Sequence, residues 1–222
     1  MDKTKLPVEI TVAHGKVEGD LVIPAAAQGL VIFAHGSGSS RHSPRNQRVA
    51  EELQRAGMGT LLMDLLSSSE ESVDLYTREH RFDIPLLAGR VVLATDWLRD
   101  QPQCQSLPVG YFGASTGAAA ALVAATQRSV AAVVSRGGRP DLAGDRLAHV
   151  KAPTLLIVGG GDTEVVALNR GAYQKIGTAE KQLEIVPGAS HLFEEPGALE
   201  QVAALARQWF TRWLGGQDLR AA

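Results

Sequence analysis

The strongest signal for chemistry is the segment Gly113-Ala114-Ser115-Thr116-Gly117, which fits the pattern G-x-S-x-G. It lies where a predicted strand runs directly into a predicted helix, so the serine would stand on a sharp turn with its hydroxyl exposed. The flanking glycines remove Cβ atoms that would clash as strand and helix close together. This context predicts that Ser115 is a nucleophile. The alternative is a helix-start turn capped by Ser115 or Thr116.

A serine hydroxyl near neutral pH needs a base to remove its proton, and the base needs a third group to orient it. Asp162 and His191 each follow the carboxyl end of a predicted strand, and sites assemble at that edge of a parallel sheet. The order Ser115, Asp162, His191 also suits such a triad. Asp162 could instead cap a helix beginning at Thr163, and His191 could be a solvated loop residue. We expect His35 to support its own loop by hydrogen bonding. The remaining histidines do not follow the last predicted strand: His14, His42, His80 and His149.

Acyl transfer also needs donors for the oxygen that becomes negatively charged, and backbone N–H groups can do this without being deprotonated. Thr116 supplies one N–H group directly after Ser115, and Ser37, in the loop after the predicted strand 30–34, supplies the second. Gly38 is the fallback donor. The same loop lacks the spacing G-x-x-x-x-G-K-[ST] and the third glycine of G-x-G-x-x-G, so a nucleotide site is not expected.

Arginines lie close to these residues in the sequence. Arg136 and Arg139 follow the predicted strand 130–134, and Arg41 and Arg45 follow the glycine-containing loop. Gly38, Arg41 and Arg136 are therefore candidate substrate-binding residues, and the arginines could meet an anionic group. Ordinary salt bridges are the alternative for all four arginines.

Alternating strand and helix patterns predict an α/β fold, with a mostly parallel eight-stranded sheet and helices on both faces. The first two strands, residues 8–13 and 16–23, should form an antiparallel hairpin. Further strands are expected at residues 30–34, 60–66, 107–112, 130–134, 154–158 and 182–186. Helices are expected up to Gly57 and at residues 84–99, 118–126, 165–176 and 199–214, with a polar loop beginning at residues 67–71. Residues 1–214 should form a single domain, and residues 215–222 a flexible tail.

The composition of the 222-residue chain argues against several function classes. Its 22 basic and 24 acidic side chains give a net charge of −2, which provides no broad basic field for nucleic acid or an anionic membrane. The longest apolar run, residues 118–125, is too short to cross a bilayer, and the first ten residues lack the apolar core of a secretory signal. We expect a cytoplasmic protein that needs no metal or cofactor. The single cysteine, Cys104, excludes an internal disulfide. The oligomeric state stays open.

Five stretches carry a resemblance to a known family: FAHGSGSSR at 33–41, RFDIPLL at 81–87, FGASTG at 112–117, SRGGRPD at 135–141 and HLFEEP at 191–196. Together they resemble the dienelactone hydrolase family, including hydrolase domains joined to phosphoribosyltransferases. The resemblance implies an α/β-hydrolase fold in which Ser115, Asp162 and His191 hydrolyse an ester. It also implies oxyanion donors at Ser37 and Thr116. Dienelactone hydrolases proper use a cysteine nucleophile, so the serine favours general carboxylic ester hydrolysis.

The resemblance also bears on access to the site. A cap is often inserted after the strand that follows the nucleophile helix, but here only about 17 residues separate Ser135 from Pro153. We therefore expect no large cap domain and an open, shallow site for small-molecule esters with short acyl groups. Two other functions stay open. The same triad could act as an acyltransferase or thioesterase, or the fold could be a non-catalytic module that binds a small ligand.

Overall fold

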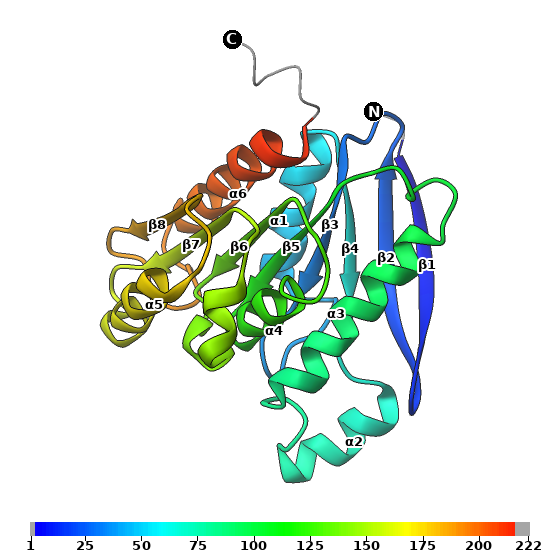
Figure 1. Ribbon diagram of the computed structural model, residues 1–222, viewed down its shortest axis with the longest axis horizontal. Helices are drawn as coiled ribbons and strands as arrows, with labels where there is room; N and C mark the ends of the chain where they lie inside the picture. Colours follow the sequence, from blue (N-terminus) through cyan, green and yellow to red (C-terminus); the bar gives the residue numbers. More distant parts are fainter. Residues whose placement is uncertain (1–2, 216–222) are drawn as a thin grey trace.

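The computed structural model describes residues 3–215, which form an eight-stranded sheet (Figure 1). In chain order the strands are β1 Lys3–Val12, β2 Gly15–Pro24, β3 Gly29–Ala34, β4 Met58–Met63, β5 Val109–Ala114, β6 Ala132–Arg136, β7 Thr154–Gly159 and β8 Lys181–Val186. Their order across the sheet is β1-β2-β4-β3-β5-β6-β7-β8. The pairs β1–β2 and β2–β4 are antiparallel, and every pair from β4 to β8 is parallel. The predicted hairpin and mostly parallel sheet are confirmed.

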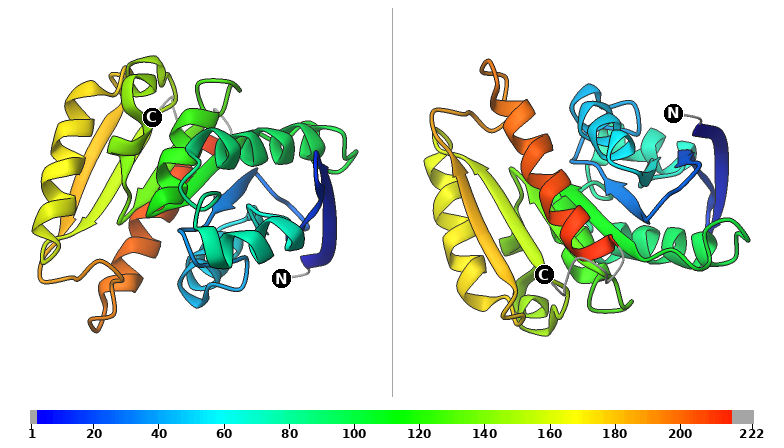
Figure 2. Two further views of the ribbon diagram at one scale, coloured as in Figure 1. Left: turned by 90° about the horizontal axis from the view of Figure 1, so that it is seen from below. Right: turned by 90° about the horizontal axis from the view of Figure 1, so that it is seen from above.

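Helices cover both faces of this sheet (Figure 2). The helices α1 Pro44–Arg55 and α6 Ala198–Leu214 lie on one face, and α3 Ile84–Arg99, α4 Thr116–Ala124 and α5 Thr163–Lys175 lie on the other. Adjacent residues of β5 point to opposite faces, as strand geometry requires. Phe112 is buried in the α1/α6 layer, and Tyr111 is buried in the other layer, where its hydroxyl bonds to Thr95 Oγ1 at 2.7 Å. The predicted helices on both faces are therefore confirmed.

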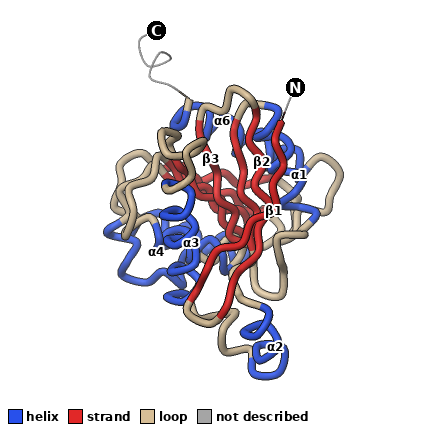
Figure 3. The backbone as a smooth tube through the Cα atoms, turned by 90° about the vertical axis from the view of Figure 1, so that its right-hand side faces the viewer, coloured by secondary structure: helices blue, strands red, loops and turns tan. Residues whose placement is uncertain are grey.

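Residues 68–77 form a further helix, α2 Ser68–Thr77, where the sequence predicted a polar loop. Ser67 begins it with a reciprocal capping box. Its hydroxyl accepts the N–H of Glu70, and the Glu70 carboxylate accepts the N–H of Ser67. The loop prediction was wrong because side-chain capping stabilises a segment that has little apolar periodicity. Helix α2 projects from the body of the molecule beyond the ends of the strands (Figure 3).

Two strands, β5 and β6, begin and end two residues later than predicted. Arg136 is therefore the last residue of β6 and not part of a loop. Strand alternation turns its side chain into the α1/α6 layer, where it is 7% exposed. Apart from Gly215, the predicted C-terminal tail lies outside the described residues.

Two features bear on expectations drawn from composition. None of the helices within residues 3–215 has the length and apolar character needed to cross a membrane. Cys104 lies shortly after α3, and its side chain is buried in the layer between the sheet and α3. Burial raises the pKa of its thiol.

Candidate active site

Ser115 lies at the turn between β5 and α4, as predicted. Its backbone has φ 50° and ψ −122°, a conformation that residues other than glycine rarely adopt. Both neighbouring glycines are required by close packing. A Cβ atom at Gly113 would lie 2.4 Å from the Cα of Ala118, and one at Gly117 would lie 2.2 Å from the carbonyl oxygen of Ala34. The Ser115 hydroxyl makes no capping hydrogen bond to α4, so it is not used as a helix cap.

A hydrogen bond joins the two predicted partners of Ser115: His191 Nδ1 lies 2.7 Å from Asp162 Oδ2. Asp162 follows β7 and His191 follows β8, so the carboxyl ends of neighbouring strands bring together residues that are 29 positions apart. Asp162 is at the N-cap position of α5, but its carboxylate makes no capping bond and faces His191 instead. When Nδ1 donates to this carboxylate, Nε2 is left to act as a base.

Ser115 and His191 both border the end of β6. The N–H of Ser115 donates to the carbonyl oxygen of Arg136 at 3.3 Å, and a Cβ atom at Gly137 would lie 3.8 Å from His191 Cε1. Among residues 3–215, no hydrogen bond joins the Ser115 hydroxyl to His191. Proton transfer between these two residues would therefore require a side-chain movement. Catalytic hydrogen bonds often tighten only when substrate binds.

The loop after β3 runs beside the serine. A Cβ atom at Gly36 would lie 3.0 Å from Ser115 Cβ, so glycine gives this loop its close approach. The N–H of Ser37 donates to Thr116 Oγ1 at 2.9 Å, which places the two predicted oxyanion donors next to each other. Thr116 begins α4, where the first N–H groups lack partners within the helix. The Ser37 N–H is occupied, and it must exchange its bond with Thr116 to serve a substrate oxygen.

His35 supports this loop, as expected from the sequence. Its Nδ1 lies 2.9 Å from the carbonyl oxygen of Gly36, and its Nε2 accepts the N–H of Leu65 at 3.1 Å. These bonds match a neutral imidazole with the proton on Nδ1. Burial lowers the pKa of His35 and so favours the neutral form, although the Gly36 carbonyl and the carboxylate of Asp64 act in the opposite direction. The imidazole thus joins the loop after β3 to the segment that follows β4.

Three of the four arginines are held by carboxylates. The pairs are Arg41 with Asp64 and Glu18, Arg45 with Glu194, and Arg139 with Asp141. This arrangement favours the ordinary salt-bridge interpretation for these arginines. Arg41 also has Asp20 4.0 Å from its Nε, so three carboxylates pair with its guanidinium, and these ion pairs would have to open before Arg41 could bind a substrate as predicted.

Arg136 differs from the other arginines because no carboxylate within the described chain pairs with it. Its Nη2 donates to Asn46 Oδ1 at 3.3 Å, and its buried Nε has no hydrogen-bond partner. Burial, helped by the nearby charge of Arg45, lowers the pKa of Arg136 to about 10. Its role in substrate binding stays a prediction.

Glu195 is a residue that the sequence analysis missed. Its carboxylate accepts the N–H of Ser190 at 3.0 Å and so ties together the loop that carries His191. This hydrogen bond lowers the pKa of Glu195. In the same loop Phe193 has φ 56°, and its ring is buried in the α1/α6 layer. Acidic residues shortly after the candidate base were visible in the sequence, but the backbone group that Glu195 binds was not.

A cavity of about 270 Å³ opens beside the loop after β3, and we call it the α2 cavity. Gly36, Ser37 and Thr116 line the part nearest to Ser115. Its leucine lining consists of Leu65, Leu66, Leu75 and Leu87, and its charged lining of Asp64, Glu71, Asp74 and Arg81. The cavity therefore adjoins the two predicted oxyanion donors, whereas Ser115, Asp162 and His191 are not among its lining residues.

Comparison with known proteins gives a curated relative from Mycobacterium tuberculosis named "putative phosphoribosyl transferase". It is 58% identical over 211 residues, which are 94% of this chain and 46% of the relative. The chain thus spans about half the length of these curated relatives.

Solved structures extend the likeness to three dimensions. A dienelactone hydrolase from Anabaena variabilis is 60% identical, with a TM-score of 0.92 over 95% of this chain and 98% of that one. An esterase from Pyrococcus furiosus shares the fold at 20% identity, with a TM-score of 0.77 over 96% of this chain and 92% of that one. The profile of the dienelactone hydrolase family matches residues 17–215. The chain therefore has the α/β-hydrolase fold and belongs to the dienelactone hydrolase family.

Proposed function

We propose that this protein is a serine hydrolase that cleaves short-chain carboxylic esters through an acyl-enzyme intermediate. The observation that carries the proposal is the convergence at one sheet edge of Ser115, in a strained turn, with the hydrogen-bonded pair Asp162 and His191. Membership of a hydrolase family supports the reaction class. Ser115 and Asp162 make no capping hydrogen bonds, which supports the assignment further, because neither side chain is used to stabilise the start of a helix.

In the first half of the proposed reaction, His191 Nε2 accepts the proton of the Ser115 hydroxyl as the oxygen attacks the ester carbonyl carbon. Asp162 orients the imidazole and stabilises its charged form. The C–O bond to the alcohol then breaks, and the alcohol leaves with the proton from His191. In the second half, water gives a proton to His191 and attacks the acyl-enzyme. The acid is released as the proton returns to Ser115.

The negative charge on the carbonyl oxygen would be stabilised by the N–H groups of Thr116 and Ser37. For Ser37 this requires a switch of partner from Thr116 Oγ1 to the substrate oxygen. The two donor residues meet where the loop after β3 contacts the start of α4, so a rotation of the Thr116 side chain away from Ser37 would free the Ser37 N–H. A carbonyl oxygen that gains charge is a stronger acceptor than a neutral hydroxyl, which favours the exchange in the transition state.

Substitution of the nucleophile tests the proposal. Ser115→Ala should lower the turnover of p-nitrophenyl acetate by on the order of a million-fold and abolish labelling by a fluorophosphonate. Ser72→Ala, an exposed serine on α2 outside the cavity, is the matched control and should leave both unchanged. Near-normal ester cleavage by Ser115→Ala would overturn the proposal. So would a failure of the unsubstituted protein to react with the fluorophosphonate.

A further inference from the structure

The α2 cavity is lined in part by Ser37 and Thr116, the two predicted oxyanion donors, so a group bonded to the reacting carbonyl can extend into it. We propose that this cavity binds an uncharged, apolar substituent of the ester, and that Leu75 on α2 determines its preferred length. The inference rests on the proposed ester hydrolysis and specifies its substrate class. At about 270 Å³ the cavity is at the small end of ligand pockets, which matches one short chain or ring and not a large molecule.

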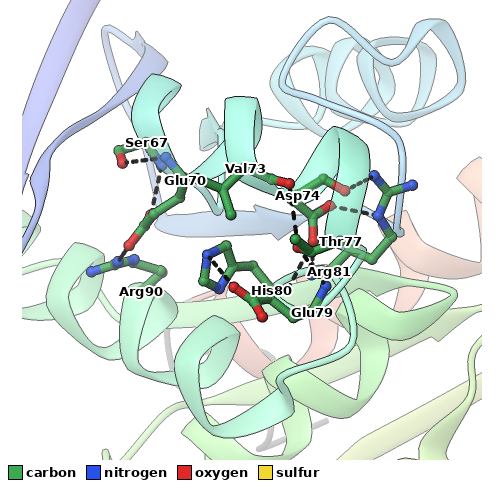
Figure 4. A network of polar contacts seen from close by, with 9 residues as sticks. All are labelled: Ser67, Glu70, Val73, Asp74, Thr77, Glu79, His80, Arg81 and Arg90. Atoms are coloured by element: carbon green, nitrogen blue, oxygen red, sulfur yellow. Dashed lines mark hydrogen bonds and ion pairs between the residues drawn. The ribbon is translucent and has the colours of Figure 1, made fainter.

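Helix α2 can act as a wall of this cavity because both of its ends are anchored. Near its start, the Glu70 carboxylate caps Ser67 and also pairs with Arg90 of α3 (Figure 4). Glu70 and Arg90 are 7% and 4% exposed, so solvent screens their pairing little. This pair joins the projecting helix to the layer of helices that covers the sheet.

The end of α2 is fastened by Asp74. Its carboxylate accepts the backbone N–H groups of His80 and Arg81 at 2.8 and 2.9 Å and also contacts the Arg81 side chain (Figure 4). Arg81 donates in addition to the Asp74 carbonyl oxygen at 2.9 Å. Burial alone would raise the pKa of Asp74, but these hydrogen bonds hold it below its usual value, so the carboxylate stays charged. The side of α2 that carries Leu75 is thus held at the cavity.

The charges around the cavity select against a carboxylate on the substrate. Arg81 carries the positive charge among the lining residues and is already paired with Asp74. Asp64 is paired with Arg41, whereas Glu71 has no ion pair among residues 3–215. An anionic substituent would therefore meet Glu71 without a free cation to compensate it. An apolar chain instead meets the four leucines.

The length preference is tested with two ester series. One varies the acyl group (p-nitrophenyl acetate and hexanoate), and the other varies the alcohol (methyl and hexyl acetate). Leu75→Ala should lower kcat/KM for the six-carbon ester, relative to that for the short ester, about tenfold in only one of the two series. The series that responds identifies the half of the ester, acyl or alcohol, that enters the cavity. Tyr76→Ala is the control, because Tyr76 lies on the same helix and does not line the cavity, whereas Leu75 lines it with a side chain that is 67% exposed. If the two variants alter the ratios equally, or Leu75→Ala alters neither, the proposed role of Leu75 is wrong.

The charge preference is tested with p-nitrophenyl hexanoate and the p-nitrophenyl monoester of adipic acid, which has a terminal carboxylate. The anionic ester should react on the order of tenfold more slowly, and Glu71→Gln should narrow this gap several-fold. Equal rates for the two esters in the unsubstituted protein would overturn the inference while leaving ester hydrolysis intact. If the protein cleaves none of the esters, including the acetate, the proposed function is wrong, and so is the inference that rests on it.

Discussion

Replacing Arg90 with methionine removes the charge that faces Glu70 of α2 and keeps an apolar side chain of similar length. Removing one partner of a buried ion pair typically costs about 3–5 kcal/mol, because the other charge is left buried and uncompensated. Both side chains here are less than 9% exposed, so the buried range applies. Glu70 keeps its bond to the Ser67 N–H, which offsets part of the loss. We therefore expect Arg90→Met to lower the free energy of unfolding by about 3 kcal/mol.

For a chain of this length, each kcal/mol shifts Tm by about 2–4 °C, so the expected decrease is about 6–12 °C. Urea unfolding followed by circular dichroism would give the free energy, and calorimetry would give Tm. Arg55→Met is the matched control, because Arg55 is 60% exposed beside Glu51 and Glu52, and its loss should cost less than about 1 kcal/mol. Adding Glu70→Gln to Arg90→Met should restore stability by removing the unpaired charge. A loss below about 1 kcal/mol for Arg90→Met would refute the reasoning.

Three further predictions concern the site and its supports. Gly117→Ala should lower Tm strongly or prevent folding, as judged by calorimetry and soluble yield, because its Cβ would lie 2.2 and 2.4 Å from two backbone carbonyl oxygens. Burial lowers the pKa of His35 in the folded protein, so as the pH falls His35 becomes protonated in the unfolded chain at a higher pH than in the folded one. The stability that the neutral imidazole provides is therefore present above about pH 6.5 and lost below it. Unfolding measured from pH 7 to pH 5 should show this loss, and His35→Gln should reduce it; an identical pH profile in the variant would contradict the assignment. Asp162→Asn should lower kcat by about ten thousand-fold, because the amide favours the wrong histidine tautomer, and a loss below tenfold would argue against its role.

Much of the site could be predicted from the sequence because its geometry follows from topology. Ser115, Asp162 and His191 each follow a predicted strand, and neighbouring parallel strands end at the same edge. What the sequence leaves open is the orientation of the side chains. The Asp162–His191 bond and the contact between Ser37 and Thr116 depend on distances of a few ångströms, which strand order does not determine.

Helix α2 and Arg41 show why other features could not be predicted. The serines and glutamates of residues 67–72 give no apolar stripe, and the stability of α2 comes from contacts with Arg90 and Arg81, which are distant or lie beyond its end. The capping pattern from Ser67 to Glu70 was a readable signal for its start. The carboxylates that hold Arg41 come from β2 and from the segment after β4, so they become its neighbours only in the folded sheet.

The buried position of Cys104 has a practical consequence for following motion in α2. Its thiol is 2% exposed and its pKa is raised, so alkylating reagents should not reach it while the protein stays folded. A cysteine introduced by Tyr76→Cys would stand on the outside of α2 and react selectively, without prior removal of the native thiol. A fluorophore or spin label attached there would report directly whether this helix shifts when an ester analogue is added.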